Sequence, residues 1–198
     1  NDALSRAYGF AAAAIKGRDV EIGINDNGFF IAGENLNEKK ILSYVNSKNL
    51  EPILREAIEK TDVLRRRFRH CASRSLMILR NYKGRSKSVG KQQVHSHFLL
   101  AAVKKISNEF PILKEARREV LEDLMDINNA LEVLKMIEKG SMKIKIYELP
   151  LVSPFGLNLI LQSHADLIRM EDKAAFMKRM HELHLKIIGS KGKKEEEI

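Results

Sequence analysis

The sequence predicts an α+β fold that is predominantly helical, in which a β-hairpin and at least one further strand pack with about eight helices. Three observations predict it. Apolar residues recur at helical spacing along most of the 198 residues. The alternation of apolar and polar residues that is typical of strands is confined to residues 19–31 and 142–147. Glycine, proline and helix-capping residues separate the helical stretches.

The first 60 residues predict a helix, a hairpin and two further helices. One apolar face predicts a helix over residues 2–16, which Gly17 would end. Alternation over residues 19–24 predicts a strand. The turn at residues 25–28 ends in Asn-Gly, which tolerates positive φ, so residues 29–31 become the return strand. Two helical patterns then cover residues 38–46 and 50–60.

The middle of the chain predicts two longer helices joined by a polar loop. Thr61 or Asp62 can cap a helix that we expect to run to Asn81. Residues 82–90 form a loop rich in glycine, serine and lysine, and residues 91–108 are helical again.

The C-terminal half is expected to be helical apart from a third strand over residues 142–147. Pro111 suits the first turn of a helix, and Gly140 suits the end of another. The predicted helices cover residues 111–125, about 130–139, a stretch beginning at Ser153-Pro154-Phe155, and 172–188, each read from the apolar spacing.

We expect one domain over residues 1–189, with no internal repeat. Its parts would be a helix-and-hairpin portion over residues 1–49, a basic helical core over residues 50–149 and C-terminal helices over residues 150–189. Residues 190–198 would be a charged tail.

Composition excludes several classes of protein. A single cysteine excludes a disulfide framework and a cysteine-rich zinc site. The longest apolar run, residues 98–103, is far shorter than the roughly 18 residues that span a bilayer, so no membrane partner is expected. Without a signal peptide, the chain is expected to be intracellular and cytoplasmic. It begins without Met, as a processed product or an excised fragment would.

The net charge of +9 comes from one segment. Residues 63–108 contain 12 Lys and Arg and no Asp or Glu, whereas the rest of the chain has 23 bases against 26 acids. A basic block of this kind is expected of a surface that binds phosphates, and nucleic acid is the favoured partner. An anionic protein or a membrane surface, or a merely solvated basic face, are the alternatives.

Helical spacing shows how this charge can coexist with a core. From Leu64 onward, one stripe is apolar and includes Phe68, Ala72 and Ile78, while the opposite face includes Arg66, Arg69, His70 and Arg80. The basic face would form a ridge about 25 Å long. Arginine suits phosphate oxygens because its guanidinium presents a planar fork of donors.

The loop after this helix adds lysines and arginine beside two glycines, and Tyr82 can stack on a base or anchor the loop internally. The candidate nucleic-acid-binding residues are therefore Arg65, Arg66, Arg67, Arg69, Arg74, Arg80, Tyr82, Lys83, Arg85, Lys87 and Lys91. The competing interpretation is that the arginines pair with the acidic helix that contains Glu115, Glu119, Glu122, Asp123 and Asp126.

No catalytic or metal site is assigned. The chain lacks the GxxxxGK[ST] phosphate loop and the GxGxxG motif. His181 and His184 share a helical face, but no third ligand is apparent. Cys71 lies on the apolar stripe, where a thiol is usually inert. The acids of residues 115–126 are expected to face solvent.

Several ordered motifs resemble the large helicase-related (Lhr) family of superfamily 2 ATP-dependent helicases, in its C-terminal, DEAD/H-associated domain. They are Asn1-Asp2-Ala3-Leu4, Asp26-Asn27-Gly28, Arg67-Phe68-Arg69 with Ala72, Arg74, Leu76-Met77 and Leu79, Phe110-Pro111 with Glu115, Arg118-Glu119 and Asp126, and Ser153-Pro154-Phe155. Two positions depart from the family pattern: Val94 follows Gln93, and Gly156 takes the place of an alanine.

The resemblance implies an accessory domain of an archaeal DNA helicase that acts in DNA repair, beside upstream motor and winged-helix domains. ATP and magnesium would be bound elsewhere in the parent hydrolase, with no cofactor in this chain. The partner would be single-stranded or tailed DNA, or RNA. Three hypotheses follow: a strand-binding domain, a scaffold whose arginines brace the fold or the motor domains, and, least favoured, a stand-alone enzyme.

Overall fold

The computed structural model describes residues 1–163 and 173–195. The chain divides into two compact units, one made of residues 1–22 and 31–144 and the other of residues 23–30 and 145–198. The division of one domain at residues 49 and 149 stays a prediction.

The first unit begins with α1 (Asp2–Lys16), which ends at Gly17 in the left-handed conformation, as expected. Small residues such as Ala7 and Ala11 are fully buried on α1. They allow α2 (Glu38–Tyr44) and α3 (Leu50–Ile58) to pack closely against it. The predicted hairpin is also present, as β1 (Glu21–Asn25) paired with β2 (Gly28–Ala32), and its residues 23–30 are counted with the second unit.

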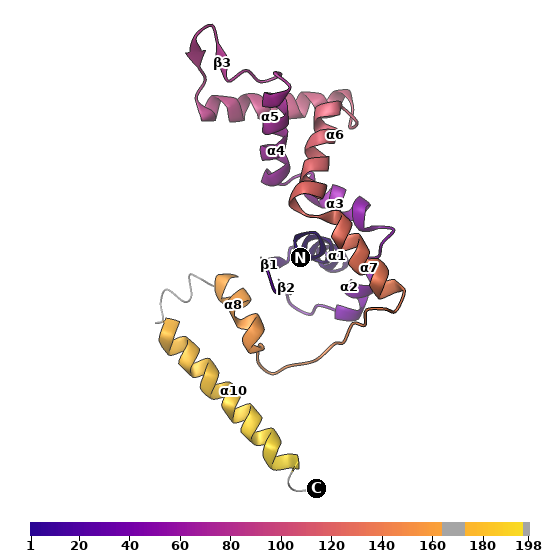
Figure 1. Cartoon of the computed structure of the whole chain (residues 1–198), viewed down its shortest axis with the longest axis vertical. Coiled ribbons are helices and arrows are strands. Elements are labelled where there is room, and N and C mark those ends of the chain that lie inside the picture. The colour runs from indigo at the N-terminus through magenta and orange to yellow at the C-terminus, as the bar shows by residue number, and fades with distance from the viewer. Residues whose placement is uncertain (164–172, 196–198) are drawn as a thin grey trace. The chain divides into compact units, whose positions relative to one another are not determined.

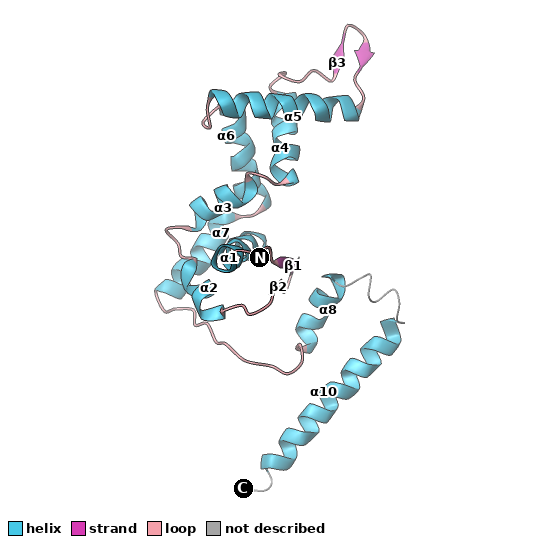
Figure 2. Cartoon of the chain, turned by 180° about the vertical axis from the view of Figure 1, so that it is seen from behind, coloured by secondary structure: helices cyan, strands magenta, loops and turns pink. Residues whose placement is uncertain are grey.

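The remainder of this unit is a second helical layer. It contains α4 (Asp62–Arg74), α5 (Val89–Ile106), α6 (Pro111–Arg118), the π-helical segment η1 (Glu119–Leu124) and α7 (Ile127–Glu138). α4 and α6 lie side by side, and α5 crosses both of them (Figures 1 and 2). Phe68, Leu113 and Val103, one from each helix, are almost completely buried. The predominantly helical α+β class is therefore confirmed.

The helix that carries the arginines is shorter than predicted. α4 ends at Arg74 rather than Asn81, because Leu76 adopts a left-handed conformation with φ 61°. Its basic ridge is therefore about 20 Å long rather than 25 Å. The predicted loop contains a small second hairpin, β3 (Asn81–Tyr82) paired with β4 (Arg85–Ser86).

One further prediction was wrong, and another holds except for the type of helix. Residues 142–147 form no strand, and Met142, Ile144 and Ile146 are all exposed, so their alternation does not reflect one buried face. The predicted helix over residues 111–125 changes at Glu119 into the wider turns of η1. Within the described part of the chain, the only strands besides β1 and β2 are therefore the short β3 and β4.

The second unit contains α8 (Pro154–Ser163) and α10 (Lys173–Glu195). α8 begins at the predicted position. The last helix continues past Ile188 to Glu195, so most of the predicted charged tail is helical, and residues 196–198 lie outside the described part. His184 on α10 lies 2.8 Å from the carbonyl oxygen of Val152, which joins α10 to the segment before α8.

A partly buried ionic cluster joins three elements of the first unit. The Glu59 carboxylate, at the end of α3, accepts hydrogen bonds from Lys104 Nζ of α5 at 2.7 Å and from Arg117 Nε of α6 at 2.6 Å. Burial alone would raise the pKa of Glu59, but these two cationic donors outweigh it and hold the pKa below its ordinary value.

This lowered pKa gives the stability of the protein a defined pH dependence. Because the folded state favours the ionised carboxylate, the stabilisation that Glu59 contributes is complete at neutral pH. This stabilisation is lost as the pH falls through the native pKa of Glu59. We expect the difference in unfolding free energy between wild type and Glu59→Gln to shrink below about pH 4.5. Urea denaturation at a series of pH values measures it, and a difference that is independent of pH would contradict the prediction.

Candidate nucleic-acid interface

The candidate interface starts from the two faces of α4. The Thr61 hydroxyl accepts a hydrogen bond from the Leu64 N–H at 3.4 Å and so begins the helix, as the sequence predicted. Leu64, Phe68, Cys71 and Ala72 are buried against α5 and α6. The arginines at intervening positions are thereby directed away from the core.

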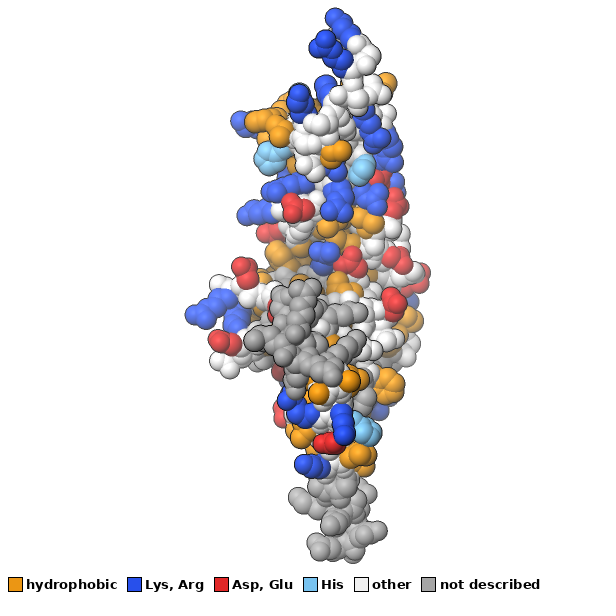
Figure 3. Space-filling model, turned by 90° about the vertical axis from the view of Figure 1, so that its left-hand side faces the viewer, with side chains coloured by type: hydrophobic (Ala, Val, Ile, Leu, Met, Phe, Trp, Pro, Cys, Tyr) orange, Lys and Arg blue, Asp and Glu red, His pale blue; other side chains and the backbone are white. Residues whose placement is uncertain are grey.

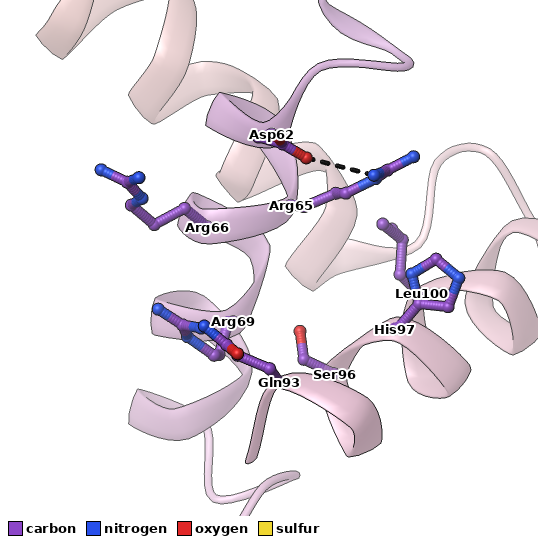
Figure 4. Close-up of a pocket in the computed structure, with 8 residues that line it drawn as sticks. All are labelled: Asp62, Arg65, Arg66, Arg69, Gln93, Ser96, His97 and Leu100. Atoms are coloured by element: carbon purple, nitrogen blue, oxygen red, sulfur yellow. Dashed lines mark hydrogen bonds and ion pairs between the residues drawn. The ribbon is translucent and has the colours of Figure 1, made fainter. Parts of the chain in front are cut away.

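α5 supplies the second wall. Ser88 caps it by accepting a hydrogen bond from the Lys91 N–H, and the helix then crosses α4. A pocket of about 360 Å³ lies between the two helices (Figure 4). α4 lines it with Asp62, Arg65, Arg66 and Arg69, and α5 lines it with Gln93, Ser96, His97 and Leu100. We call it the α4–α5 pocket.

Ser96 gives the α4–α5 pocket a buried polar group. The residue is only 5% exposed. Figure 4 shows it directed into the space between the helices. A hydroxyl both donates and accepts hydrogen bonds, so an occupant of the pocket, water included, can bond to it.

The arginines of the pocket differ in their ionic partners. Arg65 pairs with Asp62 at 3.1 Å, one turn earlier on α4. Arg66 and Arg69 form no ion pair with any carboxylate in the described ranges, so their charges remain available to an anion. The local potential is positive: burial, followed by the charges of Arg69, Arg67, Arg80 and Arg74, lowers the pKa of His70.

Two predicted binding residues are instead committed to the fold. Arg74 forms a hydrogen-bonded ion pair with Glu119 Oε1, and Arg67 Nη1 lies 3.7 Å from Glu119 Oε2. At 3.7 Å the second contact is too long for a hydrogen bond, so Oε2 has none. The pairing with the acidic helix that the sequence left open is therefore real for these two arginines.

Glu119 itself corrects an expectation. The acids of residues 115–126 were predicted to face solvent, but the Glu119 side chain is only 5% exposed. Its neighbours behave as predicted, since Glu115, Glu122 and Asp123 form an exposed cluster around Arg118. Asp126 caps α7 by accepting a hydrogen bond from the Asn129 N–H.

The other candidate residues lie in or next to the β3–β4 hairpin. Arg80, Lys83, Arg85 and Lys91 are exposed, and Lys87 is half-buried. The side chain of Tyr82 lies outside the described part of the structure. On the face shown in Figure 3, Lys and Arg side chains gather toward the end that carries this hairpin.

Sequence reasoning missed three polar residues of the α4–α5 pocket, namely Gln93, Ser96 and His97. The signal was present: with Leu100 they recur at intervals of three and four residues, which places them on one helical face. The distribution of charge did not indicate these three residues, because none of them is a permanent cation.

Other kinds of site find no support in the described residues. No group of three or more potential ligands is placed to hold a metal ion in those ranges. Burial is the largest influence on the Cys71 thiol and raises its pKa, which disfavours the reactive thiolate. No described helix combines the length and the apolar character needed to cross a bilayer.

The chain is by class a mainly helical domain with a basic surface, and comparison with known proteins gives the family. The model described as DEAD/H associated matches residues 1–156, and the chain belongs to this family. The predicted relationship to Lhr helicases is thereby confirmed.

The relatives are Lhr proteins, and several are archaeal. The chain is 45% identical to the ATP-dependent helicase Lhr-Core of Methanothermobacter thermautotrophicus, over 92% of this chain and 21% of the relative. It is 38% identical to Lhr-Core of Saccharolobus solfataricus, over 96% and 22% of the two chains. The chain thus spans about a fifth of the length of these relatives.

A solved structure shares the fold. The Mycobacterium smegmatis helicase Lhr bound to ssDNA and AMP-PNP matches with a TM-score of 0.67 and 26% identity, over 79% of this chain and 20% of that one.

Proposed function

We propose that this chain is the accessory domain of an ATP-dependent helicase and binds single-stranded nucleic acid through the α4–α5 pocket. The observation that carries the proposal is the pair Arg66 and Arg69, whose charges meet no described carboxylate, beside the hydroxyl group of Ser96. The name of the M. smegmatis relative, a helicase bound to ssDNA, supports a strand as the ligand.

The chemistry of the pocket suits a strand. Guanidinium groups bind phosphate oxygens, and the neutral donors Gln93 and Ser96 suit sugar or base edges. Motor and winged-helix domains outside this chain would bind ATP and magnesium, and they would move the strand past this surface. A cytoplasmic location and a role in DNA repair belong to the same proposal.

The proposal predicts a specific salt dependence. For single strands, log K falls with log salt concentration by about 0.7 per neutralised phosphate. The double variant Arg66→Ala/Arg69→Ala is therefore expected to bind a labelled oligothymidylate about tenfold more weakly and to reduce the slope by about 1.4. Fluorescence anisotropy between about 50 and 200 mM salt measures both quantities.

A matched variant separates the effect on binding of where the charges lie from the effect of how many there are. Lys39→Ala/Lys40→Ala removes two exposed cations from α2 and should leave both quantities near the wild-type values. Equal losses in the two double variants would contradict the proposal, because they would reflect net charge alone.

The pairing of Arg67 and Arg74 with Glu119 favours a second function for part of the basic surface. In this scaffold function, arginines brace the fold or the motor domains rather than contact nucleic acid. If it held for Arg66 and Arg69 too, their replacement would lower the melting temperature and leave strand affinity unchanged.

A further inference from the structure

The segment that joins α4 to β3 contains a left-handed backbone conformation at a residue that is not glycine. Leu76, at φ 61°, occupies the position after a helix end that glycine usually takes. The turn is held by backbone hydrogen bonds, from the Leu76 N–H to Ser73 O at 3.3 Å and from the Ile78 N–H to Ala72 O at 3.0 Å. A glycine at position 76 could form the same bonds without the steric cost of a Cβ.

Packing does not offset this cost. The Leu76 side chain is 72% exposed, whereas Ile78, two residues later, is buried and anchors the segment. Three further apolar side chains, in the segments that flank the β3–β4 hairpin in the chain, are also exposed. We call the four exposed residues the hairpin-base patch: Leu76, Met77, Leu79 and Val89. A strained residue that exposes an apolar side chain points to a role in binding rather than in folding.

The β3–β4 hairpin lies between these segments in the chain and carries positive charge. Its two strands pair only with each other among the described strands, and the Lys87 N–H donates to Arg80 O at 2.9 Å to close its base. Lys83 and Gly84 form the turn with φ values of 49° and 73°. Arg80, Lys83, Arg85 and Lys87 therefore lie along a projecting ribbon (Figures 1 and 3).

A surface that is complementary to these apolar and cationic side chains must be apolar in one part and anionic in another. The exposed face of the last base pair of a duplex has this character, because the stacked bases are apolar and the phosphates surround them. Leucine and methionine side chains insert against base steps in proteins that distort nucleic acids. The absence of any acid from residues 63–108 also suits a polyanion.

We propose that the hairpin-base patch stacks on the terminal base pair where a duplex meets a single strand, while the cations of the hairpin contact the flanking phosphates. This inference rests on the proposed strand-binding function and adds a second nucleic-acid contact to it. The α4–α5 pocket would take the single strand, and the hairpin-base patch would recognise the junction.

The test compares two probes, a single strand and the same strand with a duplex segment, the latter carrying 2-aminopurine in its last base pair. We expect the chain to bind the tailed duplex about tenfold more tightly than the strand, and Leu76→Gly to abolish that preference and the 2-aminopurine response. Single-strand affinity and melting temperature should not fall in this variant, because no buried contact is lost.

Ile106→Gly is the matched control, because Ile106 at the end of α5 is 73% exposed and the substitution changes no charge. It should retain the preference for the tailed duplex. If Leu76→Gly also retains it, the junction proposal is overturned and the strand-binding function stands. If wild type binds neither probe, the proposed function fails and this inference fails with it. Binding to anionic phospholipid vesicles that depends on Leu76, without a junction preference, would assign the patch to a membrane and overturn the proposal.

Discussion

Replacing Glu119 by glutamine is expected to lower the free energy of unfolding by about 2 kcal/mol and to leave strand affinity unchanged. The carboxylate is buried, accepts a hydrogen bond from Arg74 of α4 and lies 3.7 Å from the guanidinium of Arg67. A neutral amide of the same size weakens both contacts and presents an N–H₂ group to a cationic surrounding. Urea denaturation measures the loss, and anisotropy with an oligothymidylate measures the binding.

Two comparisons make this prediction specific. Glu115→Gln removes an exposed partner of Arg118 and should have a much smaller effect, because exposed ion pairs contribute little. The double substitution Arg67→Met/Arg74→Met should destabilise the wild-type protein more than it destabilises the Glu119→Met variant. Only in the wild-type protein does the double substitution leave the buried charge of Glu119 without its partners. Equal effects in both backgrounds would show that the arginines do not act through Glu119.

The substitution Phe68→Ala is expected to have the largest effect on stability, a loss of about 3–5 kcal/mol. Phe68 is completely buried where α4 meets α5 and α6, so its removal leaves a cavity among all three helices. Such a loss is a large share of the 5–15 kcal/mol that stabilises a typical domain. The α4–α5 pocket should be lost with it, because Phe68 holds the helix that presents Arg66 and Arg69.

Phe98→Ala is the matched comparison, since this phenylalanine of α5 is 69% exposed. It should change the unfolding free energy by less than about 0.5 kcal/mol. Thermal unfolding and strand binding of both variants are the measurements. A Phe68→Ala variant as stable as Phe98→Ala would contradict the assignment of Phe68 to the core.

The sequence predicted the helices of the first unit well, because their apolar spacing corresponds to burial. On α4 the buried residues Leu64, Phe68, Cys71 and Ala72 are those of the predicted stripe. The end of α4 was missed because Ile78 continues that stripe in register, while Leu76 takes the left-handed turn without the glycine that normally signals it. The spacing of apolar residues gives no sign of a left-handed turn that is made by a residue other than glycine.

The candidate site was predicted only in part, because charge indicates a surface and not the partner of each residue. Glu119 lies 45 residues from Arg74 in the chain, and its burial depends on how η1 packs against α4. The strand predicted over residues 142–147 failed for a related reason. A strand needs a neighbour to pair with, and alternation along one segment does not supply it.

Because several α4 arginines are already paired with carboxylates, the number of cations that the domain alone can offer to a polyanion is limited. With Arg67 and Arg74 held by Glu119 and Arg65 beside Asp62, few cations of the helix remain for a polyanion. Few phosphate contacts give loose, rapidly reversible binding, which allows a strand to slide. Joined to other strand-binding domains in one polypeptide, the same contacts gain avidity, because tethering replaces free concentration by a much higher effective concentration. A surface that binds a strand weakly by itself can thus keep the strand bound while still allowing it to slide.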